Sequence, residues 1–579
     1  MLRLFHMKRH SKISQHKKRY YIIGIAGVAM GNLAGLLKQK GHEVAGSDQE
    51  VYEPIKSMLA KEKISVFTPY SAFHVKRWRP DVVVVGNAIS RGNPELEWTL
   101  SNGQIYRSVS DILMEEFVED RVFHPPSSRL RRELRRTSVK RAKKSIVITG
   151  THGKTTTSAL VAWILEIAGL DPTVFVGGAI KGFPPGVSPI RNAVSNGVST
   201  HLIDAKAVGC GFKYGKGKYV VLEGDEYDTA FFDKNPKFLH YRPFFGLLNN
   251  IELDHIDIYQ NLDHIRAAFK SFMKLIPQNG VLAVNSEDKN AWGLVQECLK
   301  SKALWKNNSE PKIISFGTNK GDFQAKNVSY NLDSSIHHLS FDVFHLKHKI
   351  MRVNTQLSGK HNVSNILGAI AITREVGVSC ETIRKGIATF AGVKRRMEII
   401  GEKSGVTVVD DYAHHPTAVL ETINAVRQRF HVKPHRAQRI VAVFEPGSAS
   451  SRRKVFEREY INSLGKADVS LIYKPFKAGQ INPVRNSRVV FESTQELNPA
   501  GNQRRKRQDI ISNGIKKSES FSGRSVSREI NRCGGKSYFC DDLDKLMLHV
   551  KTIARAGDIL LIMSCRGFDG LREKIMGIL

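Results

Sequence analysis

The chain has 579 residues, which is too long for one hydrophobic core and predicts three or four domains. Its hydrophobic content of 41% is ordinary for a globular protein. No run reaches the roughly 18 apolar residues of a membrane-spanning helix, so we expect no membrane insertion. The six cysteines show no C-x-x-C pair and no zinc-ligand spacing, which indicates reduced thiols and a cytoplasmic location.

The net charge of +33 is unusually high, and it is unevenly distributed. Stretches 1–19, 123–144 and 501–536 supply 22 of these charges and have few residues suited to a core. We interpret them as solvated basic tails and insertions. A basic surface that binds nucleic acid is the alternative, although no aromatic residues are interleaved for base stacking.

The first α/β unit is expected over 20–120. A strand at 20–25 leads through a glycine-rich loop to a helix that ends at Lys40, and further strands follow at 42–46 and 81–85. Strands that alternate with helices predict a parallel, doubly wound sheet with ligands at the carboxyl ends of its strands.

The loop after the first strand has the spacing Gly24-x-x-Gly27-x-x-x-Gly31, which differs from the dinucleotide pattern G-x-G-x-x-G. A nicotinamide site is therefore less favoured than the diphosphate of another nucleotide at the helix N-terminus. A tight turn without a ligand is the third interpretation.

The most informative segment is the β-branched strand at 145–149, followed by a glycine loop and a helix over 155–168. This strand–loop–helix order is typical of a triphosphate-binding loop, so ATP is the expected ligand. Lys154 would contact the β and γ phosphates, and the Thr155 hydroxyl would bind Mg²⁺. The residues of the ATP loop are Gly150, Thr151, His152, Gly153, Lys154, Thr155 and Thr156.

Two later strands of this unit also end in polar residues. Glu223 follows a strand at 219–222, and His255 lies in the loop after a strand at 245–248. Since the carboxyl ends of parallel strands meet at one edge, Thr155 and Glu223 could share Mg²⁺, and His255 could hold a second cation. The alternative is a structural histidine and solvated acids.

A third α/β unit is expected from about 350, with a helix from Asn362 and strands at 406–409, 439–444, 469–472 and 559–562. Three aperiodic segments, at 121–144, 181–209 and 481–535, are interpreted as surface insertions without a catalytic role.

Polar residues of this third unit are candidates for binding the adenine, the ribose and a phosphate of the nucleotide. Asn362 suits an adenine edge, Arg396 suits a phosphate, and Asp410 or Asp411 could accept hydrogen bonds from ribose.

Four motifs, taken together, resemble the Mur ligase family of ATP-dependent peptidoglycan enzymes. They are Gly-Thr-His-Gly-Lys-Thr-Thr at 150–156, Asn-Ile-Glu-Leu-Asp-His at 250–255, Gly-Lys-His-Asn at 359–362 and Asp-Asp-Tyr-Ala-His-His-Pro at 410–416.

The resemblance implies three domains, beyond a basic tail at 1–19 and a linker at 121–144. These are a Rossmann-like UDP-sugar domain at 20–120, a central P-loop domain at 145–349 and a Rossmann-like C-terminal domain at 350–579. The implied UDP-sugar-binding residues are Gly24, Ala26, Gly27, Ser47, Asp48, Ala88 and Ser90.

The implied activity is that of the recycling members of the family. These join UDP-N-acetylmuramate to L-Ala-γ-D-Glu-meso-diaminopimelate through an acyl phosphate, with ATP and Mg²⁺. The implied catalytic residues are Lys154, Glu223 and His255, of which Glu223 and His255 join Thr155 as metal ligands. The alternatives are addition of free L-alanine to the same nucleotide and, more distantly, a basic nucleic-acid-binding ATPase. The oligomeric state stays open.

The chain departs from the recycling members in its last domain. It reads Gly-Ser-Ala-Ser at 447–450 where they tend to have Arg-Ser-Asn-Thr, and Arg-Gly-Phe-Asp-Gly at 566–570 where they have a glycine-rich end. Phe269 occupies the position of a carbamylated lysine found elsewhere in the family, as in the muramate-specific branch.

Overall fold

The computed structural model describes residues 17–119, 142–183, 209–301, 305, 310–331, 338–430, 438–475 and 520–579. They form two compact units: the described residues up to Lys143 together with Phe212–Tyr214, and all the others. Most of the three basic stretches lies outside the described residues. Among the described helices, none has both the length and the apolar character needed to cross a lipid bilayer.

The first unit contains a five-stranded sheet in the order β3-β2-β1-β4-β5, with every neighbouring pair parallel. The expected doubly wound parallel sheet is therefore confirmed. Its strands are β1 (Arg19–Ile23), β2 (Glu43–Ser47), β3 (Ser65–Phe67), β4 (Val82–Val85) and β5 (Tyr106–Arg107). Its helices are α1 (Val28–Lys40), α2 (Ile55–Lys61), α3 (Ala72–Trp78), α4 (Pro94–Ser101), α5 (Val109–Ile112) and the π-helix η1 (Leu113–Val118).

A ten-stranded sheet has the order β17-β16-β15-β14-β13-β12-β6-β9-β7-β8, and it belongs to the second unit except for the last two residues of β8. Its strands are β6 (Lys144–Thr149), β7 (Thr173–Ile180), β8 (Cys210–Lys213), β9 (Tyr219–Glu223), β12 (Phe245–Leu248), β13 (Val281–Asn285), β14 (Lys312–Gly317), β15 (Phe323–Asn331), β16 (His338–His345) and β17 (His348–Thr355). A hairpin, β10 (Asp228–Ala230) and β11 (Asp233–Pro236), precedes the short helix η2 (Lys237–His240).

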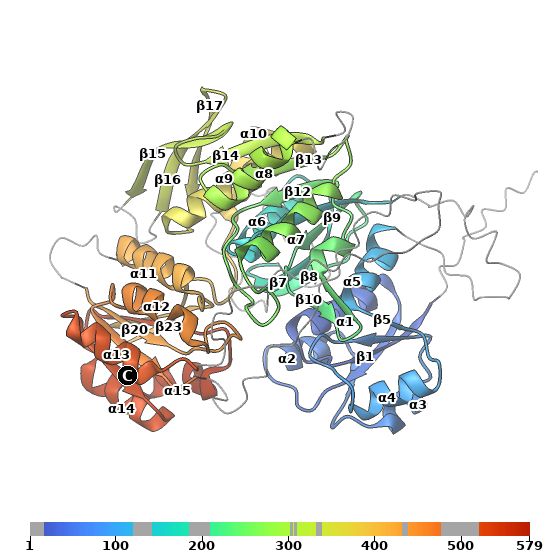
Figure 1. Cartoon of the computed structure of the whole chain (residues 1–579), viewed down its shortest axis with the longest axis horizontal. Coiled ribbons are helices and arrows are strands. Elements are labelled where there is room, and N and C mark those ends of the chain that lie inside the picture. The colour runs from blue at the N-terminus through green and yellow to red at the C-terminus, as the bar shows by residue number, and fades with distance from the viewer. Residues whose placement is uncertain are drawn as a thin grey trace, which may run out of the picture. The chain divides into compact units, whose positions relative to one another are not determined.

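Helices cover this sheet because its central strands are apolar on both faces. They are α6 (Lys154–Ile167), α7 (Leu262–Lys274), α8 (Lys289–Ser301), α9 (Lys360–Val376) and α10 (Cys380–Thr389). Helices α6 and α9 pack against each other (Figure 1).

The second unit also contains a six-stranded sheet in the order β18-β19-β23-β20-β21-β22, parallel except for the β18–β19 pair. Its strands are β18 (Glu398–Lys403), β19 (Val406–Asp411), β20 (Ile440–Phe444), β21 (Val469–Tyr473), β22 (Ser537–Cys540) and β23 (Ile559–Met563). Its helices are α11 (Pro416–Phe430), η4 (Lys454–Phe456), α12 (Glu457–Leu464), α13 (Gly523–Arg532), α14 (Leu543–Ile553), η5 (Phe568–Gly570) and α15 (Leu571–Ile578).

Two expected boundaries differ from the structure. The start of the third domain at about 350 falls inside β17, and α9 then packs on the ten-stranded sheet, so we place the last domain from β18 onward. The insertion expected to end at 535 contains α13, which buries Val526 and Ile530. Two apolar residues among polar neighbours were too weak a periodic signal for a helix.

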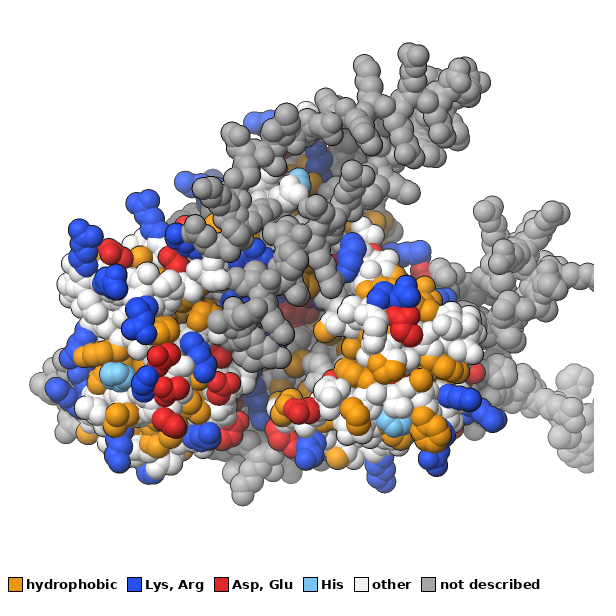
Figure 2. All heavy atoms as spheres, turned by 60° about the horizontal axis from the view of Figure 1, so that its bottom comes forward, with side chains coloured by type: hydrophobic (Ala, Val, Ile, Leu, Met, Phe, Trp, Pro, Cys, Tyr) orange, Lys and Arg blue, Asp and Glu red, His pale blue; other side chains and the backbone are white. Residues whose placement is uncertain are grey.

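One face of the described residues carries charges of both signs. On the face drawn in Figure 2, Lys and Arg side chains are interspersed with Asp and Glu. The basic stretches 1–19, 123–144 and 501–536, on which the nucleic-acid alternative rests, lie mostly outside the described residues.

A buried carboxylate holds the first unit together. Glu116, on the π-helix, accepts hydrogen bonds from Lys18 at 2.6 Å, Lys40 at 2.8 Å and the Tyr20 hydroxyl at 2.7 Å, and its Oε2 lies 3.2 Å from His42 Nε2. Burial opposes the charge, but these partners hold the pKa of Glu116 well below its usual range. The ionised form is therefore built into the fold.

We expect Glu116→Gln to destabilise the first unit by about 3 kcal/mol, since it leaves buried cations uncompensated. A depressed carboxyl pKa stabilises the fold above about pH 4.3, its unfolded value, and this contribution is lost as the pH falls further. Hydrogen exchange of β1 amides should therefore differ most between variant and parent at neutral pH. Glu115→Gln, which removes a partly exposed partner of Arg107, is the matched control. Equal exchange in both variants would contradict this account.

Candidate functional site

The phosphate-binding loop runs from the end of β6 to the start of α6, as the sequence predicts. Gly150 has a φ of +127°, and a Cβ there would lie 2.9 Å from the Asn250 amide nitrogen. Gly153 has a φ of +82°, and its Cβ would lie 2.3 Å from Asn365 Oδ1. Both positions therefore require glycine, because of backbone conformation and of space.

The neighbouring strand end fixes the loop. Strands β6 and β12 pair in parallel with Leu248 opposite Thr149, so Asn250 arrives beside the loop. The Thr151 amide donates to the Asn250 carbonyl at 3.1 Å, and the His152 amide donates to Asn250 Oδ1 at 2.7 Å. The loop is thus held in shape by the chain itself.

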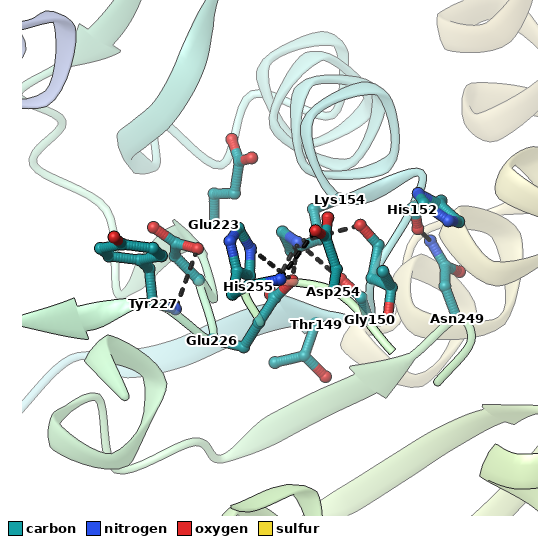
Figure 3. A network of polar contacts seen from close by, with 12 residues as sticks. Thr149, Gly150, His152, Lys154, Glu223, Glu226, Tyr227, Asn249, Asp254 and His255 are labelled. Atoms are coloured by element: carbon teal, nitrogen blue, oxygen red, sulfur yellow. Dashed lines mark hydrogen bonds and ion pairs between the residues drawn. The ribbon is translucent and has the colours of Figure 1, made fainter. Parts of the chain in front are cut away.

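Lys154 points back across the loop to a buried acid (Figure 3). Its Nζ donates to the Gly150 carbonyl at 2.7 Å and to the two carboxylate oxygens of Glu226 at 2.7 and 3.0 Å. The Glu226 side chain is fully buried, while that of Lys154 is 12% exposed. Burial disfavours the charge, but Glu226 and Asp225 raise the pKa of Lys154, so the ammonium persists.

His255 is the second cationic partner of Glu226, with Nε2 3.3 Å from Oε1. Burial opposes its charge, but Asp254 and Glu226 raise the pKa of His255 to about 9. Its backbone has a φ of +50°, which is uncommon for a residue with a side chain and is often found at functional sites.

Thr155 and Glu223 lie together, as expected. Thr155 Oγ1 donates to Glu223 Oε1 at 2.7 Å, and Arg396 Nη2 donates to the same hydroxyl at 3.1 Å. A hydroxyl and a carboxylate oxygen at this separation fit two neighbouring positions around Mg²⁺, whose bonds of about 2.1 Å place such ligands roughly 2.9 Å apart.

The residues around His255 are less suited to hold the expected second cation. Ligand atoms of Asp225, Glu226 and His255 all lie within 4.8 Å of one another. However, Lys154 already pairs with Glu226, and Lys237 Nζ lies 2.5 Å from Asp225 Oδ2. A metal ion could bind these carboxylates only after an ammonium group had moved.

Two residues expected near the base or ribose are engaged elsewhere. Asn362 is buried, donates to the Ser358 carbonyl at 2.7 Å and accepts from Asn365 at 3.0 Å. The Asp410 carboxylate accepts from Arg572 Nε at 2.8 Å and lies 3.4 Å from Arg395 Nε.

Asp411 caps a turn instead, accepting from the amides of Met397 and Ala413 at 2.7 and 2.8 Å. These contacts give Asp410 and Asp411 structural roles and leave their interaction with a ribose as a proposal.

In the first unit, the backbone amides of the glycine loop already donate hydrogen bonds to other groups of the same unit. The Gly24 and Ile25 amides donate to the Ser47 carbonyl at 2.9 and 3.0 Å, and the Ala26 amide donates to Asp48 Oδ2 at 2.9 Å. The Gly27 amide donates to the Gly24 carbonyl at 3.2 Å. A diphosphate would therefore meet the α1 amides that follow, and not these four.

The other expected UDP-sugar residues differ in exposure. The Ser47 hydroxyl is buried and donates to the buried Glu95, whereas Ala88 and Ser90 are exposed at the end of β4. Ser47 can therefore position the loop, while Ala88 and Ser90 remain accessible to a ligand.

Several residues of the central site were not predicted from the sequence. Glu226 lies in the same acidic segment as Glu223, but only Glu223 was predicted as a site residue. Asn249 directly follows β12. Asn249 Nδ2 contacts the His152 carbonyl at 3.3 Å and Asn365 Oδ1 at 3.4 Å. Lys237 carried no sequence signal, since its partner depends on how the β10–β11 hairpin folds back.

Three family models match the chain in succession. They are the Mur ligase family catalytic domain at residues 19–117, the Mur ligase middle domain at 148–373 and the Mur ligase glutamate ligase domain at 395–566. The second match ends within α9, in agreement with the position of that helix on the ten-stranded sheet.

Individual relatives are similar over nearly the whole chain. The UDP-N-acetylmuramate–L-alanyl-γ-D-glutamyl-meso-2,6-diaminoheptandioate ligase of Escherichia coli K12 is 31% identical, over 96% of this chain and 97% of its own. The UDP-N-acetylmuramate–L-alanine ligase of Clostridium acetobutylicum is 31% identical over 78% and 81%. A murein peptide ligase structure from Psychrobacter arcticus matches with a TM-score of 0.63 and 29% identity, over 97% and 98%. With its phosphate loop intact and these matches along its length, the chain belongs to the Mur ligase family.

Proposed function

We propose that this protein joins UDP-N-acetylmuramate to the tripeptide L-Ala-γ-D-Glu-meso-diaminopimelate, with hydrolysis of ATP to ADP, in peptidoglycan recycling in the cytoplasm. The observation that carries the proposal is the alignment with the E. coli ligase of that specificity, which covers almost the whole length of both proteins. The alignment with the L-alanine ligase of C. acetobutylicum covers a smaller share of each protein. Addition of free L-alanine is therefore the second candidate.

The chemistry assigned to the site is transfer of the ATP γ-phosphoryl group to the lactyl carboxylate of the muramic acid. The resulting acyl phosphate is attacked by the free amine of the peptide's L-alanine, the amide bond forms and phosphate leaves. Negative charge accumulates on the phosphoryl oxygens during the first step, so fixed cations should supply most of the stabilisation.

Lys154 is the residue best placed for that role. Without nucleotide its ammonium is neutralised by Glu226, and the P-loop carbonyls hold it at the mouth of the loop. We infer that the β and γ phosphates take over from Glu226 as its anionic partner when ATP binds. His255 then stays beside Glu226 and keeps that buried carboxylate paired.

Arg396 is a second cation for the phosphates, because its guanidinium already contacts the Thr155 hydroxyl. Thr155 and Glu223 would hold Mg²⁺, which supplies charge neutralisation between the ATP phosphates and the substrate carboxylate. The remaining proposed nucleotide contacts are the loop residues 150–156 and, less directly, Asn362 and Asp410.

The acceptor is tested by supplying UDP-N-acetylmuramate and ATP with either the tripeptide or L-alanine, and measuring ADP release and the product mass. We expect kcat/KM to be at least about 100-fold higher with the tripeptide, a difference of about 2.7 kcal/mol. Turnover with L-alanine alone would favour the second candidate. ADP release that depends on DNA or RNA and on no amine would favour the distant nucleic-acid-dependent ATPase.

We expect Lys154→Met to lower kcat about 10²–10³-fold, as is usual when one preorganised electrostatic partner of a transition state is removed. Lys234→Met is the matched control, because Lys234 also pairs with a central-domain carboxylate, Asp228, at 2.8 Å, but lies in the β10–β11 hairpin. Melting curves would establish that both variants fold. A folded Lys154→Met enzyme with near-parental kcat would exclude the assigned role.

Glu223→Gln should raise the Mg²⁺ concentration for half-maximal rate more than about tenfold, since an amide oxygen is a weaker ligand than a carboxylate. Mn²⁺ binding in the presence of ADP, followed by electron paramagnetic resonance, should weaken in parallel. Glu297→Gln, which removes a surface partner of Arg266, should leave both unchanged. Parental Mn²⁺ affinity in Glu223→Gln would remove Glu223 from the metal site.

A further inference from the structure

A second group of side chains that could hold a metal ion includes a residue of the phosphate loop. His152 comes from the loop, Glu252 from the segment after β12, and His415 from the residue before α11. Their ligand atoms all lie within 4.8 Å of one another. His152 belongs to the loop proposed to bind ATP, whereas Glu252 and His415 have no part in the proposed ligation chemistry.

The separations suit a tetrahedral ion. His152 Nε2 lies 3.3 Å from Glu252 Oε2, and His415 Nδ1 lies 3.6 Å from the same oxygen. Zinc bonds of about 2.0–2.2 Å place neighbouring tetrahedral ligands roughly 3.3–3.6 Å apart. Both separations therefore match the distance between two ligands of one tetrahedral zinc ion.

Outer contacts orient two of these ligands. His415 Nε2 lies 3.3 Å from the Leu253 carbonyl, which can only accept, so Nε2 carries the proton and Nδ1 presents its lone pair to Glu252. The Thr417 amide donates a long hydrogen bond of 3.4 Å to Nδ1, which a metal ion would replace, and the Thr417 hydroxyl donates to Glu252 Oε2 at 2.7 Å. A carbonyl behind the histidine and a hydroxyl on the carboxylate are typical supports of protein metal ligands.

We propose that His152, Glu252 and His415 form a binding site for a transition-metal ion of the zinc type, separate from the magnesium ligands Thr155 and Glu223. Two imidazoles favour zinc, cobalt or nickel over magnesium. The side chains of His152 and Glu252 are 21% and 30% exposed, so water can complete the fourth position.

A metal ion at this site would link the phosphate loop to the start of α11. His152 follows Thr151 in the loop, and its amide and carbonyl are already held by Asn250 and Asn249. Fixing its ring as well restricts the adjustment that Lys154 needs in order to leave Glu226. Zinc should therefore weaken ATP binding, and this consequence alone rests on the proposed function.

The test is a cobalt titration of the full chain, freed of any histidine tag and of metals, without ATP or substrates. We expect one Co²⁺ per chain with the intense visible bands of tetrahedral cobalt, displaced by Zn²⁺ and retained in excess Mg²⁺. Because no turnover is measured, the result does not depend on whether the ligase assay succeeds. Absence of these bands would overturn the proposal.

Variants locate the ion. His415→Ala should weaken cobalt binding by more than about tenfold, and His152→Ala, whose side chain is more exposed, provides a second test if His415→Ala fails to fold. His361→Ala is the matched control, since His361 lies 3.6 Å from one carboxylate, that of Glu421, as His415 does from Glu252. His255→Ala tests the other cluster. Bands that survive the first two variants, or disappear in either of the last two, would contradict the assigned site.

Discussion

A buried ammonium faces a buried carboxylate at the centre of the candidate site, and its other parts are arranged around that pair. The Glu226 side chain has no exposure to water, so its charge must stay compensated, and Lys154 and His255 both pair with it. Removing one partner of such a pair costs about 3–5 kcal/mol, because the remaining charge is stranded. In the proposed function, nucleotide binding would exchange one anionic partner of Lys154 for another, and His255 would keep Glu226 paired after that exchange.

The parallel sheet explains how residues 70 to 100 positions apart reach this pair. Strands β6, β9 and β12 are neighbours in parallel register, so the phosphate loop, Glu223–Glu226 and Asn249–His255 all leave from one edge. Helix α9 brings Asn365 against Gly153, and the segment after α10 brings Arg396 to Thr155. His152 and Glu252 also leave from this edge, and His415 reaches them from the residue before α11, so two chemically different clusters lie near a single loop.

The phosphate loop, the parallel sheets and the Thr155–Glu223 pair could be predicted from sequence, because a strand end, a glycine pattern and a helix start are local signals. The antiparallel strands β15–β17 and the place of α9 could not, since they depend on which sheet edge remains open. Asp410 illustrates the limit: its residue type suits a ribose, yet two arginines distant in sequence engage it. The pairing of Lys237 with Asp225 likewise depends on tertiary structure alone.

In the proposed reaction, a carboxylate of the sugar nucleotide receives the γ-phosphoryl group of ATP. This step is tested most directly with UDP-N-acetylmuramate labelled with ¹⁸O in both oxygens of its lactyl carboxylate, followed by mass analysis of the phosphate released. Attack of the carboxylate on phosphorus and departure of phosphate from the acyl carbon predict one ¹⁸O in each phosphate and one in the new amide. Unlabelled phosphate, or label recovered in AMP, would contradict the account.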